Sequence, residues 1–196
     1  MWSILTAAAV ILASSAALAN EPSSHPLRSV PDLSAAMPSN GDWAGFYLGL
    51  QTGSGTAYRN FDGDRGDLGG LTARGIHGGH RKDFGRLVTG TEVDAHTVKL
   101  GNTGNRHKLL RFKTTLGVDL GRFNPYGIFG TAYAIPEETT LTPSFGLAYG
   151  LGANLKLTEH VMVGLEYTSQ TFEDFDSFPG LEVEGRVTQF RTAFRF

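Results

Sequence analysis

Serine and histidine side chains are the residues of this chain that could carry nucleophilic catalysis. Such chemistry needs a nucleophile and a general base within hydrogen-bond reach, with a third group that orients the base. The candidate nucleophiles are Ser144 and Ser169, and the candidate bases are His96, His107 and His160. The sequence contains no G-x-S-x-G segment, and its histidines are scattered over strand-like and turn-like segments. We therefore predict no catalytic residues and no enzymatic activity.

Metal and cofactor sites are not predicted either. His77 and His80 are three residues apart, which on a strand places them on opposite faces, so they cannot bind one metal ion together. The chain has no cysteine, which excludes thiolate ligands and disulfides. The segment FDGDRGD at 61–67 resembles a fragment of a calcium loop and contains Arg-Gly-Asp, but it lacks the other ligands of a calcium loop. We predict a solvated surface loop there.

Most other charged residues alternate with apolar ones, as in β-strands with one oily and one polar face. In residues 109–121, LLRFKTTLGVDLG, apolar side chains such as Leu110 and Phe112 share one face, and Arg111, Lys113 and Asp119 share the other. Eight segments of about ten residues show this pattern, the length at which a tilted strand crosses a bilayer. They are 43–51, 70–82, 86–95, 109–121, 125–135, 144–157, 161–171 and 187–196, of which 70–82 and 125–135 alternate less regularly.

The connections between these segments alternate in length. Three are tight, at 83–85, around 122–124 and at 158–160. The other four, at 55–67, 97–107, 136–143 and 173–185, are long and polar. Short turns on one rim and long loops on the other are typical of outer-membrane barrels.

Periodicity alone leaves two closed architectures open. In a soluble barrel or sandwich the apolar faces point inward, and in a membrane barrel they point outward. The polar face is rich in glycine and carries its charges at strand centres, which suits the small interior of a membrane barrel. We predict an all-β fold, an eight-stranded antiparallel up-and-down transmembrane β-barrel.

The N-terminus indicates export. Residues 4–13 are apolar and lead to Ala17-Leu18-Ala19, a signal-peptidase pattern, and the apolar run is shorter than a membrane-spanning anchor requires. We predict a signal peptide at 1–19, a flexible proline- and serine-containing segment at 20–42 and a barrel domain at 43–196. The net charge is −2 and the basic residues are scattered, so no nucleic-acid partner is predicted.

Several segments together resemble the small eight-stranded outer-membrane β-barrel family, related to the transmembrane domain of outer-membrane protein A. They are DWAGFYLGLQTG, GIHGGHRKDFGRLVTGTEVD, LLRFKTTLGVDLGRFNPYGIFGTAYA, GLAYGLGANLKLTEHVMVGLEY and the terminal Phe. The resemblance implies location in the outer membrane among its lipids and lipopolysaccharide. It implies that Phe190, Phe194 and Phe196 form an insertion signal read by the barrel assembly machinery. His80 and Lys82 depart from the family, which usually carries aromatic residues there.

The resemblance also places His77 and Arg81 on the lumen face, with His77 near Glu92. We expect a lumen charge network drawn from His77, Arg81, Glu92, Asp94, Arg111, Lys113, Asp119, Lys156, Glu166, Arg191 and Arg195. Buried charges must be paired, so this set could form a packed plug or line a narrow ion path. We favour a non-enzymatic barrel with a structural or surface-interaction role and an unidentified loop ligand. The alternatives are a narrow passive channel and, less favoured, a lipid-modifying enzyme.

Overall fold

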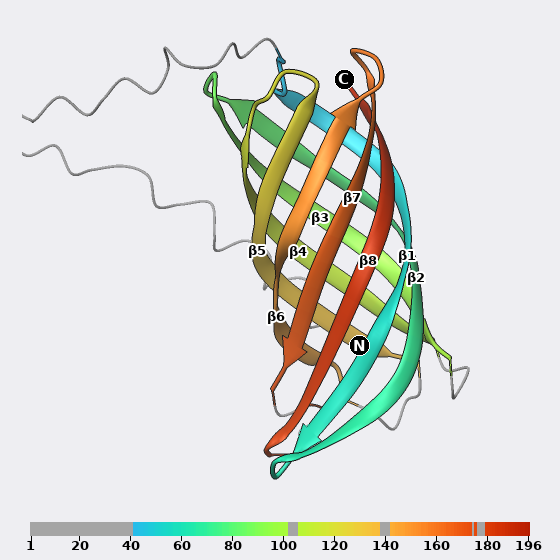
Figure 1. The fold of residues 1–196 in the computed structure, drawn as a ribbon. Helices are drawn as coiled ribbons and strands as arrows, with labels where there is room; N and C mark the ends of the chain where they lie inside the picture. The colour runs from blue at the N-terminus through green and yellow to red at the C-terminus, as the bar shows by residue number, and fades with distance from the viewer. Residues whose placement is uncertain (1–40, 102–105, 138–141, 174, 176–178) are drawn as a thin grey trace, which may run out of the picture. The chain divides into compact units, whose positions relative to one another are not determined.

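The computed structural model describes residues 41–101, 106–137, 142–173, 175 and 179–196, which form a closed antiparallel barrel in which each strand pairs with its sequence neighbours and β8 pairs with β1 (Figure 1). The strands are β1 (Gly45–Phe61), β2 (Asp64–Asp83), β3 (Leu87–Leu100), β4 (Arg106–Val118), β5 (Phe123–Pro136), β6 (Ser144–Lys156), β7 (Val161–Phe172) and β8 (Leu181–Arg195). The predicted fold class is confirmed. The predicted signal peptide at 1–19 and residues 20–40 of the predicted flexible segment lie outside the described residues.

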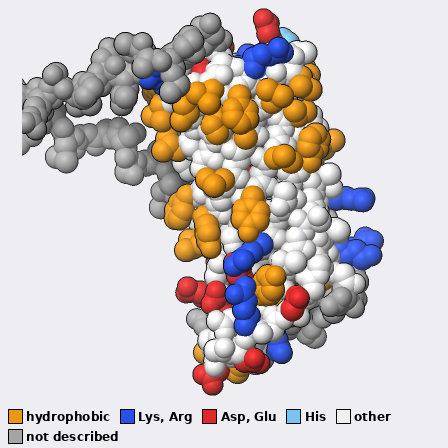
Figure 2. Space-filling model, in the orientation of Figure 1, with side chains coloured by type: hydrophobic (Ala, Val, Ile, Leu, Met, Phe, Trp, Pro, Cys, Tyr) orange, Lys and Arg blue, Asp and Glu red, His pale blue; other side chains and the backbone are white. Residues whose placement is uncertain are grey.

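The apolar faces of the strands point outward. On β4, Leu110, Phe112 and Leu116 are 42%, 47% and 58% exposed, whereas Arg111 and Lys113 between them are buried. Figure 2 shows apolar side chains spread over the upper and middle part of the barrel wall, with charged side chains at the top rim and in the lower part. The alternative with the apolar faces inward is therefore wrong. No helix among the described residues is long and apolar enough to cross a membrane.

Three tight connections lie at one end of the barrel, which we call the short-turn end. They join β2 to β3, β4 to β5 and β6 to β7, at 84–86, 119–122 and 157–160. Gly85 and Gly121 have φ values of 90° and 76°, a conformation that glycine adopts without steric cost. The short turns are close to their predicted positions.

The connections at the opposite end are shorter than predicted. The predicted long loop at 55–67 is a hairpin in which β1 and β2 continue to a tight turn at Asp62 and Gly63. Both turn residues have positive φ, 50° and 82°, and an Asp-Gly pair favours such a turn because it matches the twist of the strands. Residues 181–185, also predicted as loop, begin β8. The calcium-loop-like FDGDRGD is thus the tip of a β-hairpin.

The interior of the barrel is filled in layers. A small apolar cluster at the short-turn end contains Trp43, Tyr47, Val88, Met162 and Ala193. Two further apolar clusters lie nearer the opposite end, one centred on Leu71 and Val187 and one on Leu109 and Phe172. Most of the buried charged side chains lie between these apolar layers.

Glycine on the lumen face makes room for these side chains. A Cβ atom placed on Gly49 would lie 2.5 Å from Nε2 of His77 and 2.8 Å from Cβ of Ala193, and closer still to the Thr192 carbonyl oxygen. On the outward face of β5, a Cβ atom on Gly127 would meet only the Leu116 carbonyl oxygen, at 3.9 Å. The two positions differ in available space and not in backbone φ.

We therefore expect Gly49→Val to disrupt the barrel and Gly127→Val to be tolerated. Overpacking a filled interior costs about 1–3 kcal/mol or more. The measurement is the heat-dependent shift in SDS electrophoresis that a folded, detergent-resistant barrel gives after refolding. Equal folded fractions for both variants would contradict the tight packing at Gly49.

Candidate functional site in the barrel lumen

Six charged side chains meet at the centre of the lumen. The register of β3 with β4 pairs Glu92 with Lys113 and Asp94 with Arg111, which places two carboxylates opposite two cations. Glu166 on β7 faces them across the lumen. The Lys113 ammonium lies 2.7 Å from Glu92, 2.8 Å from Asp94 and 2.8 Å from Glu166. One cation therefore joins three carboxylates from two strands.

Arg111 and Arg191 complete the central network. Arg111 donates two parallel hydrogen bonds to Asp94, at 2.8 and 2.9 Å, and further bonds of 2.9 Å to Thr168 and Gln189. Arg191 on β8 forms ion pairs with Glu92 and Glu166. The planar guanidinium suits this role because its five donors can bind several acceptors at once. The network thus ties β3, β4, β7 and β8 together.

The central network is electrically balanced. Three carboxylates (Glu92, Asp94 and Glu166) face three cations (Arg111, Lys113 and Arg191), a formal sum of zero, and each residue is at most 2% exposed. Removing such charges from water costs several kcal/mol per ion, which their mutual attraction offsets only with good geometry and additional hydrogen bonds. The network has both, and it fills this cross-section of the barrel.

Uncharged and histidine side chains form an outer layer around the network. His77 Nδ1 lies 3.3 Å from Glu92, the contact expected from the sequence. His96 Nε2 lies 3.0 Å from Asp94, and the Tyr47 hydroxyl donates a 2.7 Å hydrogen bond to Glu92. The remaining members are Gln51, Tyr126, Thr168 and Gln189. The sequence prediction omitted these neutral residues and His96. The alternation of faces along a strand does place His96 on the same face as Glu92 and Asp94, because the three residues are two positions apart.

Four residues predicted for the network lie elsewhere. Arg81 is buried in the lumen, but its guanidinium lies over the Tyr47 ring at 4.3 Å, and among the described residues it forms no ion pair with a carboxylate. Asp119, Lys156 and Arg195 lie at the short-turn end. The alternation of faces along the chain correctly predicts that these three side chains face inward. They are too far along the strands to reach the centre of the barrel.

Trp43 closes the short-turn end of the lumen. It is 1% exposed, its backbone N–H donates to Asp83 at 2.9 Å, and its indole Nε1 donates to Asp119 at 3.2 Å and to the Gly121 carbonyl at 3.1 Å. The Lys156 ammonium lies 4.4 Å from the centre of the ring, a cation–π distance. Trp43, two residues before β1, thus turns across the barrel mouth and covers it.

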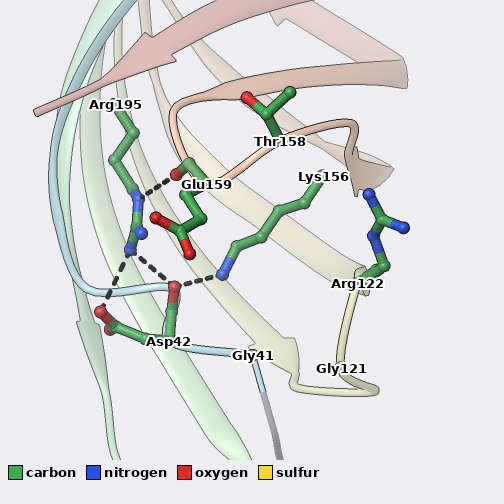
Figure 3. A pocket seen from close by; sticks show the side chains of 8 residues that line it. All are labelled: Gly41, Asp42, Gly121, Arg122, Lys156, Thr158, Glu159 and Arg195. Atoms are coloured by element: carbon green, nitrogen blue, oxygen red, sulfur yellow. Dashed lines mark hydrogen bonds and ion pairs between the residues drawn. The ribbon is translucent and has the colours of Figure 1, made fainter.

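Asp42 anchors this segment to the barrel rim (Figure 3). Its carbonyl oxygen accepts hydrogen bonds from Lys156 and Arg195, and its carboxylate lies 3.3 Å from Arg195, which also donates to the Glu159 carbonyl at 3.1 Å. A cavity of about 760 Å³ lies beside it, lined by Gly41, Asp42, Gly121, Arg122, Lys156, Thr158, Glu159 and Arg195. Lys156 and Arg195 therefore hold the N-terminal segment rather than the lumen network.

A second cavity of about 300 Å³ lies in the opposite half of the lumen. Its walls are mainly apolar and include Leu71, Leu109, Phe172 and Val187, and they also include Arg111 of the central network. The cavity therefore borders the charged cross-section.

Two of the candidate catalytic residues and the two candidate metal-binding histidines have other neighbours. Ser169 donates to Glu184 at 2.9 Å, and the His160 ring stacks on Phe194, so neither is part of a serine–histidine pair. His77 is buried in the lumen while His80 contacts Phe46 on the outer wall, consistent with their predicted opposite faces. In the part of the chain that the structure describes, no three His, Asp or Glu side chains are grouped to hold a metal ion.

Comparisons with known proteins gave a family match and similar solved structures. The sequence profile of the outer membrane protein beta-barrel domain matches residues 5–196. The crystal structure of Neisserial surface protein A is similar, with a TM-score of 0.51 and 15% identity over 78% of this chain and 98% of that one. Ail, the attachment invasion locus protein of Yersinia pestis, gives 0.49 and 13% over 78% and 99%. No curated protein matches the sequence.

The network predicts a large difference between two arginines of β8. Arg191→Met would leave Glu92 and Glu166 with less compensation in a buried site, and breaking such a pair costs about 3–5 kcal/mol. Arg186→Met is the matched control, because Arg186 lies five residues away on the same strand, faces outward and pairs with Glu184 at 2.7 Å. We expect a much smaller loss there.

The measurement is the free energy of unfolding in denaturant, with the barrel in lipid vesicles. Equal losses for the two variants would show that the central network does not stabilise the fold.

Proposed function

Given that the chain belongs to the family of outer membrane protein β-barrel domains, we propose that it is a closed, non-enzymatic barrel with a structural and surface-interaction role in the Gram-negative envelope. Family membership implies a location in the outer membrane. In such barrels the short turns face the periplasm and the longer connections face outside. The short-turn end, with Trp43, is accordingly the periplasmic end, and the β1–β2 hairpin is at the extracellular end.

The central network is the observation that carries this proposal. A conducting lumen needs a continuous water-filled path, as in wide porins, whereas the interior of an eight-stranded barrel is just wide enough for side chains to fill. Here Lys113 and Asp94 are at most 1% exposed, and the charges compensate one another. Trp43 adds a second closure at the periplasmic end. The arrangement supports a plug that specifies and stabilises the barrel.

The extracellular end supports the surface-interaction role. The β1–β2 hairpin continues the sheet well past the belt of apolar side chains, which raises its tip above the membrane. Exposed polar residues at the tip, such as Asp62 and Asp64, are available to a partner outside the cell. Loops and hairpins on a rigid scaffold are where binding residues concentrate.

We expect the wild-type protein to give no steady single-channel current in a planar bilayer. Trp43→Ala is the control, because it opens the periplasmic mouth and leaves the charged cross-section filled, so it should also remain silent.

The alternative, a narrow passive channel, predicts the opposite result. A reproducible wild-type current that changes when Arg111 or Glu166 is replaced by alanine would show that ions pass through the network, and would overturn the closed-barrel proposal.

We further propose that the C-terminal strand carries the signal for assembly. Phe190, Phe194 and Phe196 all point outward and are 51%, 48% and 73% exposed. The rings of Phe194 and Phe196 meet edge to face at 5.3 Å, and the backbone N–H of Phe196 donates to the Phe46 carbonyl at 3.0 Å. The terminal residue thus lies at the seam between β8 and β1, where an assembly machine would have to engage the strand before closure.

Phe196→Ser should reduce insertion into the outer membrane several-fold. Phe129→Ser is the control, since Phe129 is also an outward phenylalanine, 64% exposed, but lies in β5. Both variants lose the same apolar side chain, so a purely hydrophobic effect would lower insertion equally. The measurement is the heat-shiftable fraction in urea-washed outer membranes, and equal reductions would contradict the signal.

A further inference from the structure

Four cations form a group on the outer wall of β2, β3 and β4, which we call the basic wall. They are Arg74, Lys99, Arg106 and Lys108, and all four side chains are exposed. The strand register sets their neighbours: Lys99 is directly opposite Arg106, and Arg74 and Lys108 flank Thr97 on either side. The group therefore covers adjacent positions on three consecutive strands.

Within the described part of the chain, the basic wall is not compensated by carboxylates. Like charges directly opposite each other on a sheet destabilise it, and Lys99 and Arg106 are such a pair. Among the described residues, none of the four cations forms an ion pair with Asp or Glu. The other outward cations near this height behave differently, because Arg65 and Arg186 both pair with Glu184, at 3.4 and 2.7 Å.

The basic wall begins where the apolar belt ends. On β4 the outward residues from Val118 to Leu110 are apolar except Thr114, and Lys108 and Arg106 follow directly. At about 3.3 Å per residue and a tilt of about 40°, the step from Val118 to Lys108 spans roughly 25 Å along the barrel axis, the height of the lipid-facing band of such barrels. Lys108 therefore lies at the outer boundary of the hydrocarbon.

We propose that the basic wall binds the phosphate groups of the outer-leaflet glycolipid, lipopolysaccharide, while its acyl chains pack against the apolar belt below. The belt offers Ile76, Leu110 and Phe112 directly beneath the cations, with exposed fractions of 54%, 42% and 47%. This inference rests on the outer-membrane location in the proposed function and adds the residues and the chemical group of one partner.

The spacing of the cations favours a lipid with several phosphates. Lys99 and Arg106 are adjacent, whereas Arg74 and Lys108 are separated by one intervening strand, about 10 Å, so a single phosphate cannot reach all four. The hydroxyl of Thr97 lies between the second pair and can donate to a phosphate or sugar oxygen. A phospholipid with one phosphate would satisfy only one of the two pairs.

The test measures the dissociation constant of purified lipopolysaccharide for the refolded protein in detergent micelles. The variant replaces Arg74, Lys99, Arg106 and Lys108 with glutamine. Each cation near an anionic lipid surface contributes roughly fivefold to affinity, so we expect weakening of about a hundredfold or more. The control replaces Arg59, Arg65, Lys82 and Arg122 with glutamine, which removes the same charge outside the basic wall, and should change affinity little.

Three results would overturn the inference. They are equal affinity of the two variants, undiminished binding of dephosphorylated lipopolysaccharide, and equal or tighter binding of phosphatidylglycerol or of a soluble sulfated glycan at the basic wall. Failure of the proposed function is distinguishable, since it would appear as a wild-type protein that is absent from the outer membrane or shows no heat-dependent shift.

Discussion

A sheet whose outer face meets hydrocarbon can leave no backbone N–H or C=O group unpaired, and this requirement shapes the whole chain. Pairing of β8 with β1 removes both sheet edges. Closure with only eight strands then leaves a narrow interior, which large side chains can enter only where a neighbour such as Gly49 has none. Within that space the polar face cannot be solvated, so its charges have to satisfy one another. The central network is a consequence of closing the sheet.

Much of the fold could be predicted from the sequence, because alternation of apolar and polar residues along a strand indicates directly which face each side chain occupies. Leu110 and Arg111 were assigned to opposite faces correctly for this reason. The alternation does not indicate how far along the barrel axis a residue lies. The sequence therefore predicts Lys156 and Arg195 among the central charges, although they hold the N-terminal segment. Neutral partners such as Gln189 were missed because an amide pairs with a charge only in three dimensions. The hairpin at Asp62 and Gly63 was missed because its polar residues resembled a loop, although Asp-Gly favours that turn.

The two polar regions of the barrel follow opposite electrostatic rules. Inside, each cation of the central network meets a carboxylate, as Arg111 meets Asp94, because an uncompensated charge there has neither water nor a ligand to stabilise it. Outside, Lys99 and Arg106 stand opposite each other, and among the described residues neither forms an ion pair with a carboxylate, which contact with solvent makes tolerable. Internal balance stabilises the fold, and the external excess of positive charge is the basis of the lipid contact proposed above. In this chain, charges on the lumen face thus stabilise the fold, and charges on the outer face are the ones proposed to interact with a partner.

The seam between β1 and β8 also has a kinetic consequence. Contacts between neighbouring strands are local, but Leu48 and Phe194 lie near opposite ends of the barrel sequence and are direct partners. Such non-local pairing forms slowly, since the entropy of closing a long loop must be lost before any contact compensates it. Until β8 arrives, both edge strands stay open to pairing with other chains. The last strand of the barrel therefore decides how long the chain remains vulnerable to aggregation.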